Sequence, residues 1–378
     1  MLLALSSDQE LFTETTAKLL DDLVPVGELR RLREDPVGFD RQYWRRGAEL
    51  GWTSLLVGEG HGGGSIGEHG LIDLTLVAYE FGRHAAPGPL AVANVVAATL
   101  SDAGHSDTGV IEGLVAGTTL ATWGLAEPVP GDRLGCIALE IRLEGDEVVL
   151  NGTKRPVESA SVADHLLVTG RTGEGLTQVL VPAGTTGMTI TPMESVDMTR
   201  RFSVVTLEDV RLPRAAVVGN VGSADAQVAR QLDIALAVSC AESVGAMQAA
   251  FDMTVEWAFD RYSFGRPLAS YQELKHRFAD MKTWLEAGHA ISDSATRAAA
   301  EGAARAAELL STAKAFIGDY GSELLQDCVQ IHGGIGVTFE HDLHLYLRRH
   351  TLDRALFGTP ADHRQRLCDI VEAEEQVA

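Results

Sequence analysis

The chain has 378 residues, of which 45% are hydrophobic and 22% are charged. That length suffices for two or three domains, and the composition argues against extended disorder. The formal net charge is −22, from 31 Lys and Arg against 53 Asp and Glu. Nucleic acid and anionic membranes are therefore poor partners, because both are themselves negative. A polyanionic ligand would need local Arg or Lys side chains to offset the same field.

The first third of the sequence, from residue 8 to about residue 115, has apolar side chains at helical spacing. Ser7 and Asp8 are expected to cap a first helix that continues to Leu23. Further helices are expected over Leu71–Gly82 and over Pro87–Leu100, after a turn-rich loop at Gly58–Gly64.

The hydrophobic period changes near residue 118 to short alternating runs bounded by Gly, Asp and Pro. Runs of that length and spacing predict an antiparallel β-domain that ends near Val217. The expected strands are Cys136–Leu143, Val148–Leu150, His165–Thr169, Gln178–Val181 and Ser203–Leu207.

Helical spacing returns at Ala224 and persists to the C-terminus. One long segment, Ser292–Ile317, is rich in alanine, which suits close helix packing. The predicted class is therefore α+β, with an N-terminal helical domain (1–117), a middle antiparallel β-domain (118–222) and a C-terminal helical bundle (223–378).

The four cysteines, Cys136, Cys240, Cys328 and Cys368, have neither disulfide-framework nor metal-site spacing, so we expect reduced structural thiols. The N-terminus does not resemble a signal peptide, and we expect no membrane span. These features indicate a cytoplasmic protein.

Two segments in the C-terminal half carry the chemical information. The first runs from Arg261 to Met281 and contains Phe264 and Gln272; the second runs from Gln330 to Thr338. Together, in this order and at this separation, they resemble the flavin-binding signature of the acyl-CoA dehydrogenase family. The order of helical, β and helical regions is also that of the family.

The resemblance implies that the first segment contacts flavin adenine dinucleotide (FAD). In the family the residue matching Arg261 reaches across a dimer interface to the FAD of the neighbouring subunit, and a guanidinium suits pyrophosphate because it offers paired donors and stays charged. Phe264 matches an aromatic residue that lines the cofactor, and Gln272 matches an amide that contacts it.

The second segment supplies the other half of that contact, again by resemblance. Gln330 matches a contacting amide, and the adjacent Gly333 and Gly334 would let the adenosine approach the backbone because no Cβ intervenes. The pattern is not a Rossmann fingerprint, since no strand precedes it.

The catalytic base of the family is missing from both of its known positions. Phe357 stands where related chains read Tyr-Glu-Gly-Thr, although Gly358 and Thr359 still match. The alternative base position, on the helix before Arg261, falls on Ala235. We expect no catalytic residue in this chain, and Glu242, which faces the same way two turns further along, is expected to be a paired helix carboxylate.

The β-domain also departs from the family at the flavin. The segment Ala126–Asp132 replaces a Thr-Glu-x-x-x-Gly-Ser-Asp pattern, and Pro156, Val157 and Glu158 replace a Trp-Ile-Thr strand beside the isoalloxazine ring. Proline removes a donor, and Glu158 would place an anion beside a ring that becomes anionic on reduction. An intact flavin pocket on this side of the chain is not expected.

His341 and His344 lie three residues apart on a predicted helix, where we expect a solvated face rather than a zinc site, because further ligands at fixed spacing are missing. We expect no metal site.

The resemblance therefore implies a subunit of a heteromeric, steroid-degrading acyl-CoA dehydrogenase of the α2β2 kind. Such a flavoprotein oxidoreductase would place FAD between unlike subunits, and a second family member would supply the catalytic glutamate. The substrate would be a bulky acyl-CoA, by analogy with lipid and steroid side-chain metabolism. Two alternatives remain open: a flavin-dependent oxygenase on the same fold, which needs no α-proton base, and a structural paralogue without flavin.

Overall fold

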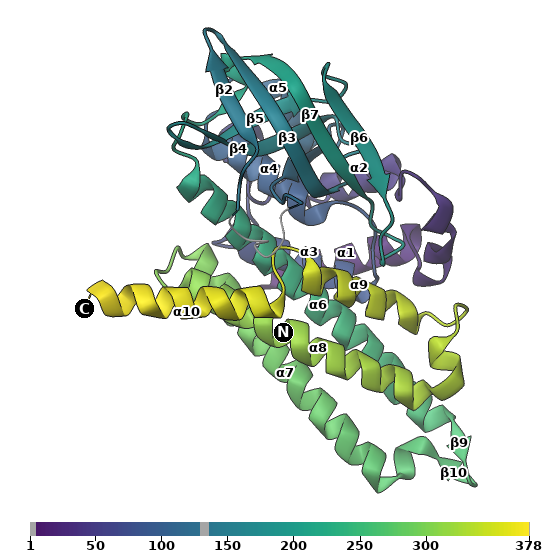
Figure 1. Cartoon of the computed structure of the whole chain (residues 1–378). Helices are drawn as coiled ribbons and strands as arrows, with labels where there is room; N and C mark the ends of the chain where they lie inside the picture. Colours follow the sequence, from purple (N-terminus) through teal and green to yellow (C-terminus); the bar gives the residue numbers. More distant parts are fainter. Residues whose placement is uncertain (1–4, 129–135, 378) are drawn as a thin grey trace. The chain divides into compact units, whose positions relative to one another are not determined.

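The computed structural model describes residues 5–128 and 136–377, with side chains as far as Ala373 (Figure 1). Its internal contacts divide the chain into two compact units, each assembled from segments far apart in the sequence. The first unit contains the chain up to Arg30, Thr75–Ala86 and the chain from Leu236 onward. The second contains Arg31–Leu74 and Pro87–Ala235. The three-domain division of the sequence remains a prediction.

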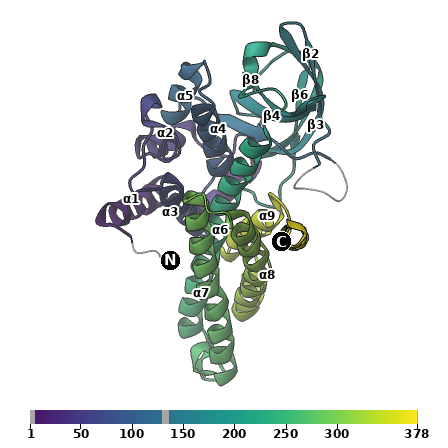
Figure 2. The same cartoon turned by 90° about the vertical axis from the view of Figure 1, so that its left-hand side faces the viewer.

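The first unit is helical. Alanine-rich helices α7 and α8 run side by side in it (Figure 2). Its elements are α1 (Ser7–Leu23), most of α3 (Gly70–Arg83), most of α6 (Asp225–Asp260), a hairpin of β9 (Tyr262–Ser263) and β10 (Arg266–Pro267), η4 (Leu268–Ser270), α7 (Gln272–Ala300), α8 (Ala306–His332), η5 (Gly333–Val337), α9 (Leu343–Ala355) and α10 (Pro360–Val377).

The start of the first helix differs from the sequence expectation. The first helix is capped by Ser6 rather than by Ser7 or Asp8: Ser6 Oγ accepts a hydrogen bond from the Gln9 amide at 3.2 Å, and the Gln9 side chain accepts one from the Ser6 amide at 3.0 Å. This capping box satisfies two amides at the helix start.

The alanine-rich segment Ser292–Ile317 is not one helix, because a tight turn separates α7 from α8. Gly302 has φ +64, and the Ala303 amide donates to the Ala298 carbonyl at 2.9 Å. This is the left-handed glycine cap that ends many helices. Alanine favours helix on both sides of the turn, so composition alone masks the break.

Helices α3 and α6 cross in close contact within the first unit. A Cβ on Gly82 would lie 1.8 Å from the Glu242 carbonyl oxygen, and one on Gly245 would lie 2.0 Å from the Tyr79 carbonyl oxygen. Only glycine allows the two backbones to approach this closely. The crossing therefore fixes α6, which leads directly to Arg261.

Helix α6 is apolar and long enough to pass a composition test for a membrane span, but 89% of the tested window is buried inside the fold. A buried apolar helix of this kind is typical of a protein core.

The second unit packs helices with a sheet. Its helices are η1 (Val26–Glu34, shared with the first unit), α2 (Arg41–Glu49), η2 (Glu59–His61), α4 (Leu90–Asp102) and α5 (Thr108–Val115). The strands are β1 (Ala121–Gly124), β2 (Glu140–Glu144), β3 (Glu147–Glu158), β4 (His165–Thr172), β5 (Gly175–Pro182), β6 (Met188–Met193), β7 (Phe202–Pro213) and β8 (Val217–Val218), with η3 (Arg214–Ala216) between β7 and β8.

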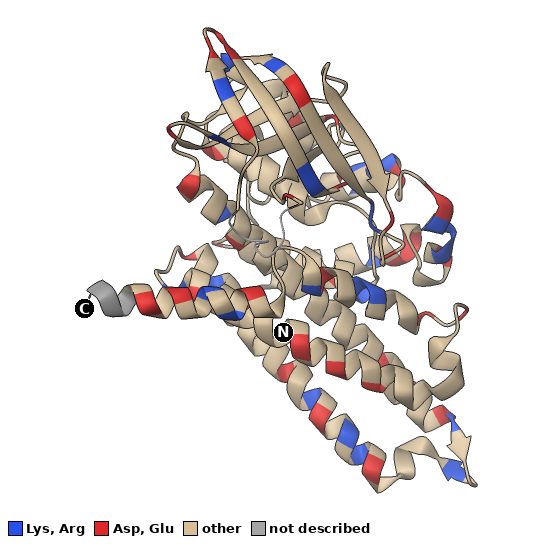
Figure 3. Cartoon of the chain, in the orientation of Figure 1, with Lys and Arg blue, Asp and Glu red and all other residues tan. Residues whose placement is uncertain are grey.

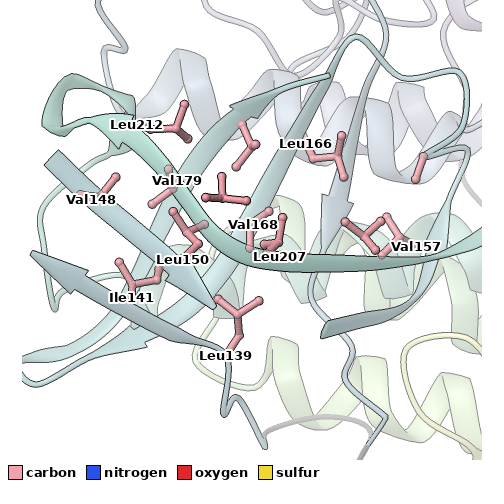
Figure 4. Close-up of a cluster of buried hydrophobic side chains, with 14 of the residues drawn as sticks. Leu139, Ile141, Val148, Leu150, Val157, Leu166, Val168, Val179, Leu207 and Leu212 are labelled. Carbon is pink, nitrogen blue, oxygen red and sulfur yellow. The ribbon is translucent and has the colours of Figure 1, made fainter. Parts of the chain in front are cut away.

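Among the described residues the sheet has the order β6-β7-β3-β2-β4-β5-β8, with β1 beside β4. It is mixed rather than wholly antiparallel, because β1 and β2 both pair parallel to β4, as in Ala121 opposite His165 and Glu140 opposite Arg171. Apart from those two pairings, the predicted antiparallel arrangement holds. Inward-facing Val, Leu and Ile side chains fill the core of the sheet (Figure 4).

Candidate functional site

The predicted site begins where α6 ends. After Asp260 the chain forms the β9–β10 hairpin, with Phe264 and Gly265 as its two-residue turn at φ 49 and φ 78. Two left-handed residues define the tight turn that matches the twist of a hairpin. The side chain of Phe264 is 98% exposed at the tip.

Arg261 lies at the base of this hairpin. Its amide donates to the Trp257 carbonyl at 2.8 Å, and its carbonyl accepts from the Leu268 amide at 2.8 Å, so its backbone is held from both sides. The guanidinium is exposed and lies 5.8 Å from the centre of the Trp257 ring, within range of a cation–π contact. In Figure 3 the basic residues of the β9–β10 hairpin are drawn in blue.

Gln272 is the first residue of α7, and its side-chain Nε2 lies 3.1 Å from His276 Nε2. The hairpin is tied to this helix start, because the Tyr271 hydroxyl donates to the Ser263 carbonyl at 2.7 Å and the Arg266 guanidinium lies 3.9 Å from the centre of the Tyr271 ring. Gln272 is therefore held close to the hairpin.

An aromatic stack joins the two segments of the predicted site. The rings of Trp257 and His332 are stacked with centroids 5.3 Å apart and planes at 15°. His332 ends α8 and immediately precedes Gly333. Burial lowers the pKa of His332, so its ring stays neutral near pH 7. Sequence reasoning missed both residues, although Trp257 lies one helical turn before Arg261.

The glycine turn after α8 is open. Gly333 has φ +65, and a Cβ built on either Gly333 or Gly334 would have no neighbour within 4 Å. Gln330, Gly333 and Gly334 are all exposed. An accessible glycine backbone and an exposed guanidinium, linked through the Trp257–His332 stack, are groups of the kind that bind the adenosine and pyrophosphate of FAD. The residues present therefore fit this half of the cofactor.

The strand that would face the isoalloxazine ring has a different character. Glu158 is buried and its carboxylate pairs with the guanidinium of Arg200, which is equally buried. The backbone carbonyl of Glu158 accepts a hydrogen bond from Thr122 Oγ1 at 2.5 Å, and Val157 lies in the core of the sheet. Glu158 is thus half of a buried ion pair, with a partner that the sequence did not indicate.

The other departure in the β-domain is described only in part, because residues 129–132 of Ala126–Asp132 lie outside the described residues. Glu127 of that segment pairs with the buried Lys154 at 2.5 Å and accepts hydrogen bonds from the Ala138 and Leu139 amides. The Glu127 carboxylate therefore holds the backbone just before β2.

Neither of the two base positions presents a proton acceptor on its side chain. Ala235 is fully buried on α6. Phe357 follows α9 at φ 56, and its carbonyl accepts a hydrogen bond from His363 Nε2 at 2.9 Å. A bulky residue at positive φ is a genuine backbone outlier.

Glu242 is a paired carboxylate, as expected. Its carboxylate lies 2.5 Å from the Arg349 guanidinium, with side-chain exposures of 2% and 0%. Arg349 also donates to the carbonyls of Ala85 and Ala86 at 3.2 and 2.9 Å. The pair is built into the helix packing and carries no feature of a base.

The expectation of a solvated His341–His344 face is wrong for His344. That ring is buried, stacks on Phe339 and lies 3.0 Å from the Phe339 carbonyl through Nε2. Within the described part of the chain, no group of three or more His, Cys, Asp or Glu is arranged to hold a metal ion.

Comparison with known proteins assigns this chain to one family. The acyl-CoA dehydrogenase N-terminal domain matches residues 6–108, and the acyl-CoA dehydrogenase C-terminal domain matches residues 226–370. Acyl-CoA dehydrogenase IpdE2 of Mycolicibacterium smegmatis is 30% identical over 365 residues, covering 96% of this chain and 98% of the relative. IpdE2 of Mycobacterium tuberculosis is 29% identical and covers 95% and 96%.

Solved structures agree. A variant of the Tcur3481-Tcur3483 steroid ACAD superposes with a TM-score of 0.87 at 26% identity, covering 98% of this chain and 99% of that chain. Butyryl-CoA dehydrogenase from Megasphaera elsdenii has a TM-score of 0.88 at 24% identity, over 98% and 100%. A glutaryl-CoA dehydrogenase from Mycobacterium smegmatis in complex with FADH2 has 0.87 at 20%, over 97% and 95%. Because their identity is below 25%, the last two structures support only the assignment of the fold.

The chain belongs to the acyl-CoA dehydrogenase family, whose members are flavoprotein oxidoreductases that act on CH–CH bonds. The predicted fold class is confirmed. The roles assigned to single site residues remain predictions.

Proposed function

We propose that the chain is the half-site subunit of a heteromeric acyl-CoA dehydrogenase. It supplies the pyrophosphate- and adenosine-binding half of an FAD site, and an unlike family member supplies the isoalloxazine pocket and the catalytic base. The Tcur3481-Tcur3483 steroid ACAD, whose name joins two designations, supports such an assembly. The IpdE2 relatives support the acyl-CoA dehydrogenase activity.

A contrast within the chain carries this proposal. The six predicted cofactor residues, Arg261, Phe264, Gln272, Gln330, Gly333 and Gly334, are all exposed and belong to segments joined by the Trp257–His332 stack. On the strand that the resemblance puts beside the isoalloxazine ring, Glu158 is instead buried and paired with Arg200. Exposed residues for the adenosine and pyrophosphate, together with a buried ion pair on the strand for the ring, suit a cofactor that another subunit mostly holds.

In this role the residues of the chain bind and orient. Arg261 would neutralise the pyrophosphate, which matters in a chain of formal net charge −22. Bound FAD would supply the acceptor for the hydride that leaves the acyl β-carbon. Removal of the α-proton would fall to a partner glutamate, because Phe357 and Ala235 cannot accept a proton.

We further propose a bulky acyl-CoA as the substrate, with a steroid side chain as the acyl group, by analogy with the steroid ACAD relative. The cytoplasm is the proposed location. Free thiols at Cys136 and Cys368, both exposed, are compatible with a reducing compartment.

Flavin content tests the proposal. The chain expressed alone should carry little FAD, whereas co-expression with a complementary family member should give a yellow complex with about one FAD per unlike pair. In that complex Arg261→Ala should weaken FAD binding roughly tenfold or more, since a charge-assisted contact contributes about 1.5–3 kcal/mol. Arg305→Ala, which removes an exposed arginine paired with Glu308 elsewhere in the same unit, is the matched control and should retain FAD. Stoichiometric FAD on a homo-oligomer of this chain would contradict the proposal.

One observation favours a second candidate. Phe357 is no obstacle for a flavin-dependent oxygenase, which removes no α-proton. That enzyme needs a complete flavin pocket on one type of subunit, so it would carry FAD when purified alone. A chain that takes up no flavin alone or with any family partner would instead be a structural paralogue.

A further inference from the structure

The loop that follows the glycine turn is held by a side chain from the other end of the sequence. Arg30, in η1, donates from Nε to the Phe339 carbonyl at 2.7 Å and from Nη2 to the Glu340 carbonyl at 2.6 Å. The same Nη2 pairs with the carboxylate of Asp342. Nη1 donates to the Gly27 carbonyl at 3.1 Å, which ties the guanidinium back to its own segment.

The geometry uses what is particular to arginine. A planar guanidinium can address two successive carbonyls and a carboxylate at once, and it keeps its charge at every working pH. The Arg30 side chain is only 19% exposed and that of Asp342 33% exposed, so solvent screens this pair less than it screens a surface pair. An ammonium in the same place would lack the fork.

Two other contacts also support the turn: Gly336 packs against Val329 of α8, and His344 stacks on Phe339 and lies 3.0 Å from its carbonyl. Gly333 and Gly334 begin it, and glycine has the greatest backbone freedom of any residue. The Thr338 amide and hydroxyl both donate to the Ile335 carbonyl, at 3.1 and 2.9 Å, which closes the turn on itself. Its orientation also depends on how the residues that follow it are held, and Arg30 contacts three of them, Phe339, Glu340 and Asp342.

We propose that Arg30 is a positioning residue of the half-site. It does not touch the cofactor; through the backbone of residues 339–342 it fixes the glycine turn in the orientation in which the adenosine half of FAD binds. This inference rests on the proposed function. A purely structural role, in which Arg30 only anchors the N-terminal segment, is the alternative.

The test has two parts. In the chain alone, Arg30→Met should raise hydrogen exchange in peptides covering residues 333–342 about tenfold or more, since it removes several bonds to a charged donor. In the complex with its partner, the same variant should weaken FAD binding about tenfold while the melting temperature of the chain stays close to that of wild type. Arg30→Lys should restore part of the FAD affinity.

A matched control is Arg305→Met, which removes an exposed pair with Glu308 at 2.7 Å elsewhere in the same unit and should change neither measurement. Asp342→Asn keeps both carbonyl bonds and should give an intermediate effect, so it serves if Arg30→Met does not fold.

The outcomes are distinguishable. Unchanged exchange over residues 333–342 overturns the proposal, and so does faster exchange with wild-type FAD affinity. If Arg261→Ala strips FAD in that second case, the proposed function survives and only the role of Arg30 falls. If neither variant affects FAD, both fall together.

Discussion

Phe264 and Phe357 are two of five non-glycine residues in the described chain with a left-handed backbone. A bulky side chain at positive φ costs about 1–2 kcal/mol, so it persists only where the surroundings impose it. At Phe264 the two-residue hairpin imposes it, and at Phe357 the His363 contact and the following Gly358, at φ 100, contribute. Both phenylalanines stand at positions that the family resemblance marks as functional.

At position 357 we predict an effect of packing rather than of chemistry. Phe357→Ala should change dehydrogenation by the complex only modestly, because in the proposed complex the partner would supply the base and a phenyl ring mainly fills volume. Phe357→Glu should not create a second active site, since Pro156, Val157 and Glu158 stand where the family resemblance expects the strand beside the flavin ring, and the proposal leaves this subunit without that ring.

Single-turnover bleaching of the flavin in complexes carrying each variant measures this. A loss of roughly 10³-fold in the alanine variant, with FAD still bound, is the size expected for losing a catalytic group. Such a loss would show that the chain holds part of the catalytic site.

At the scale of elements, the crossing of α3 and α6 decides where the hairpin stands. The two helices touch backbone to backbone at Gly82 and Gly245, and the buried Glu242–Arg349 pair ties α9 to the same place through the Ala85 and Ala86 carbonyls. Breaking one partner of a buried pair leaves an uncompensated charge, which is strongly destabilising. This rigid crossing supports the long α6 whose end carries Arg261.

Gly245→Ala should therefore destabilise the chain. The added Cβ would meet the Tyr79 carbonyl oxygen at 2.0 Å, and overpacking of this kind costs about 1–3 kcal/mol. Gly288→Ala is the control: it is also buried in a helix, but its Cβ would have ordinary contacts, the nearest at 3.6 Å from Val244. That variant should be neutral or gain about 0.5–1 kcal/mol of helix propensity. Denaturant unfolding distinguishes them, and equal effects would contradict the close crossing.

At the scale of the whole molecule, the first unit buries several neutral imidazoles. Burial lowers the pKa of His289, His350 and His363 to about 4 each. His350 is held by Ser243, whose Oγ lies 2.6 Å from Nδ1, and His289 by Gln248 at 3.2 Å. Neutral partners of this kind suit the uncharged ring and leave the charged form without compensation.

Acid should therefore unfold the chain early. Above about pH 6.5 these histidines are neutral in both states, so they give stability no pH dependence; below it the unfolded chain binds protons that the folded chain refuses. With a folded-state pKa of about 4, each ring should cost up to about 1.4 kcal/mol per pH unit between 6.5 and 4.

Denaturant unfolding at pH 7.5, 6.5 and 5.5 measures that slope. His350→Gln should reduce that slope by about one ring's share. A free energy of unfolding that stays level from pH 6.5 to 5.5 would rule out buried neutral histidines.

The sequence by itself determined the order of helical, β and helical regions, the two flavin-related segments and the absence of a glutamate at Phe357. Each of these is a local pattern, because hydrophobic period and motif spacing are properties of neighbouring residues. Local patterns did not predict the break between α7 and α8 at Gly302, because helix propensity is high on both sides of it. They also did not predict the short strands β1 and β6.

The tertiary structure decided the rest of the site. The Trp257–His332 stack, the Glu158–Arg200 pair and the hold of Arg30 on a loop 309 residues away join positions whose side chains give no sign in the sequence of which partner they meet. An arginine or a glutamate has the same propensity whether it is solvated or paired, so only folding selects its partner. Folding paired Glu158 with Arg200 and placed Arg30 against the carbonyls of Phe339 and Glu340.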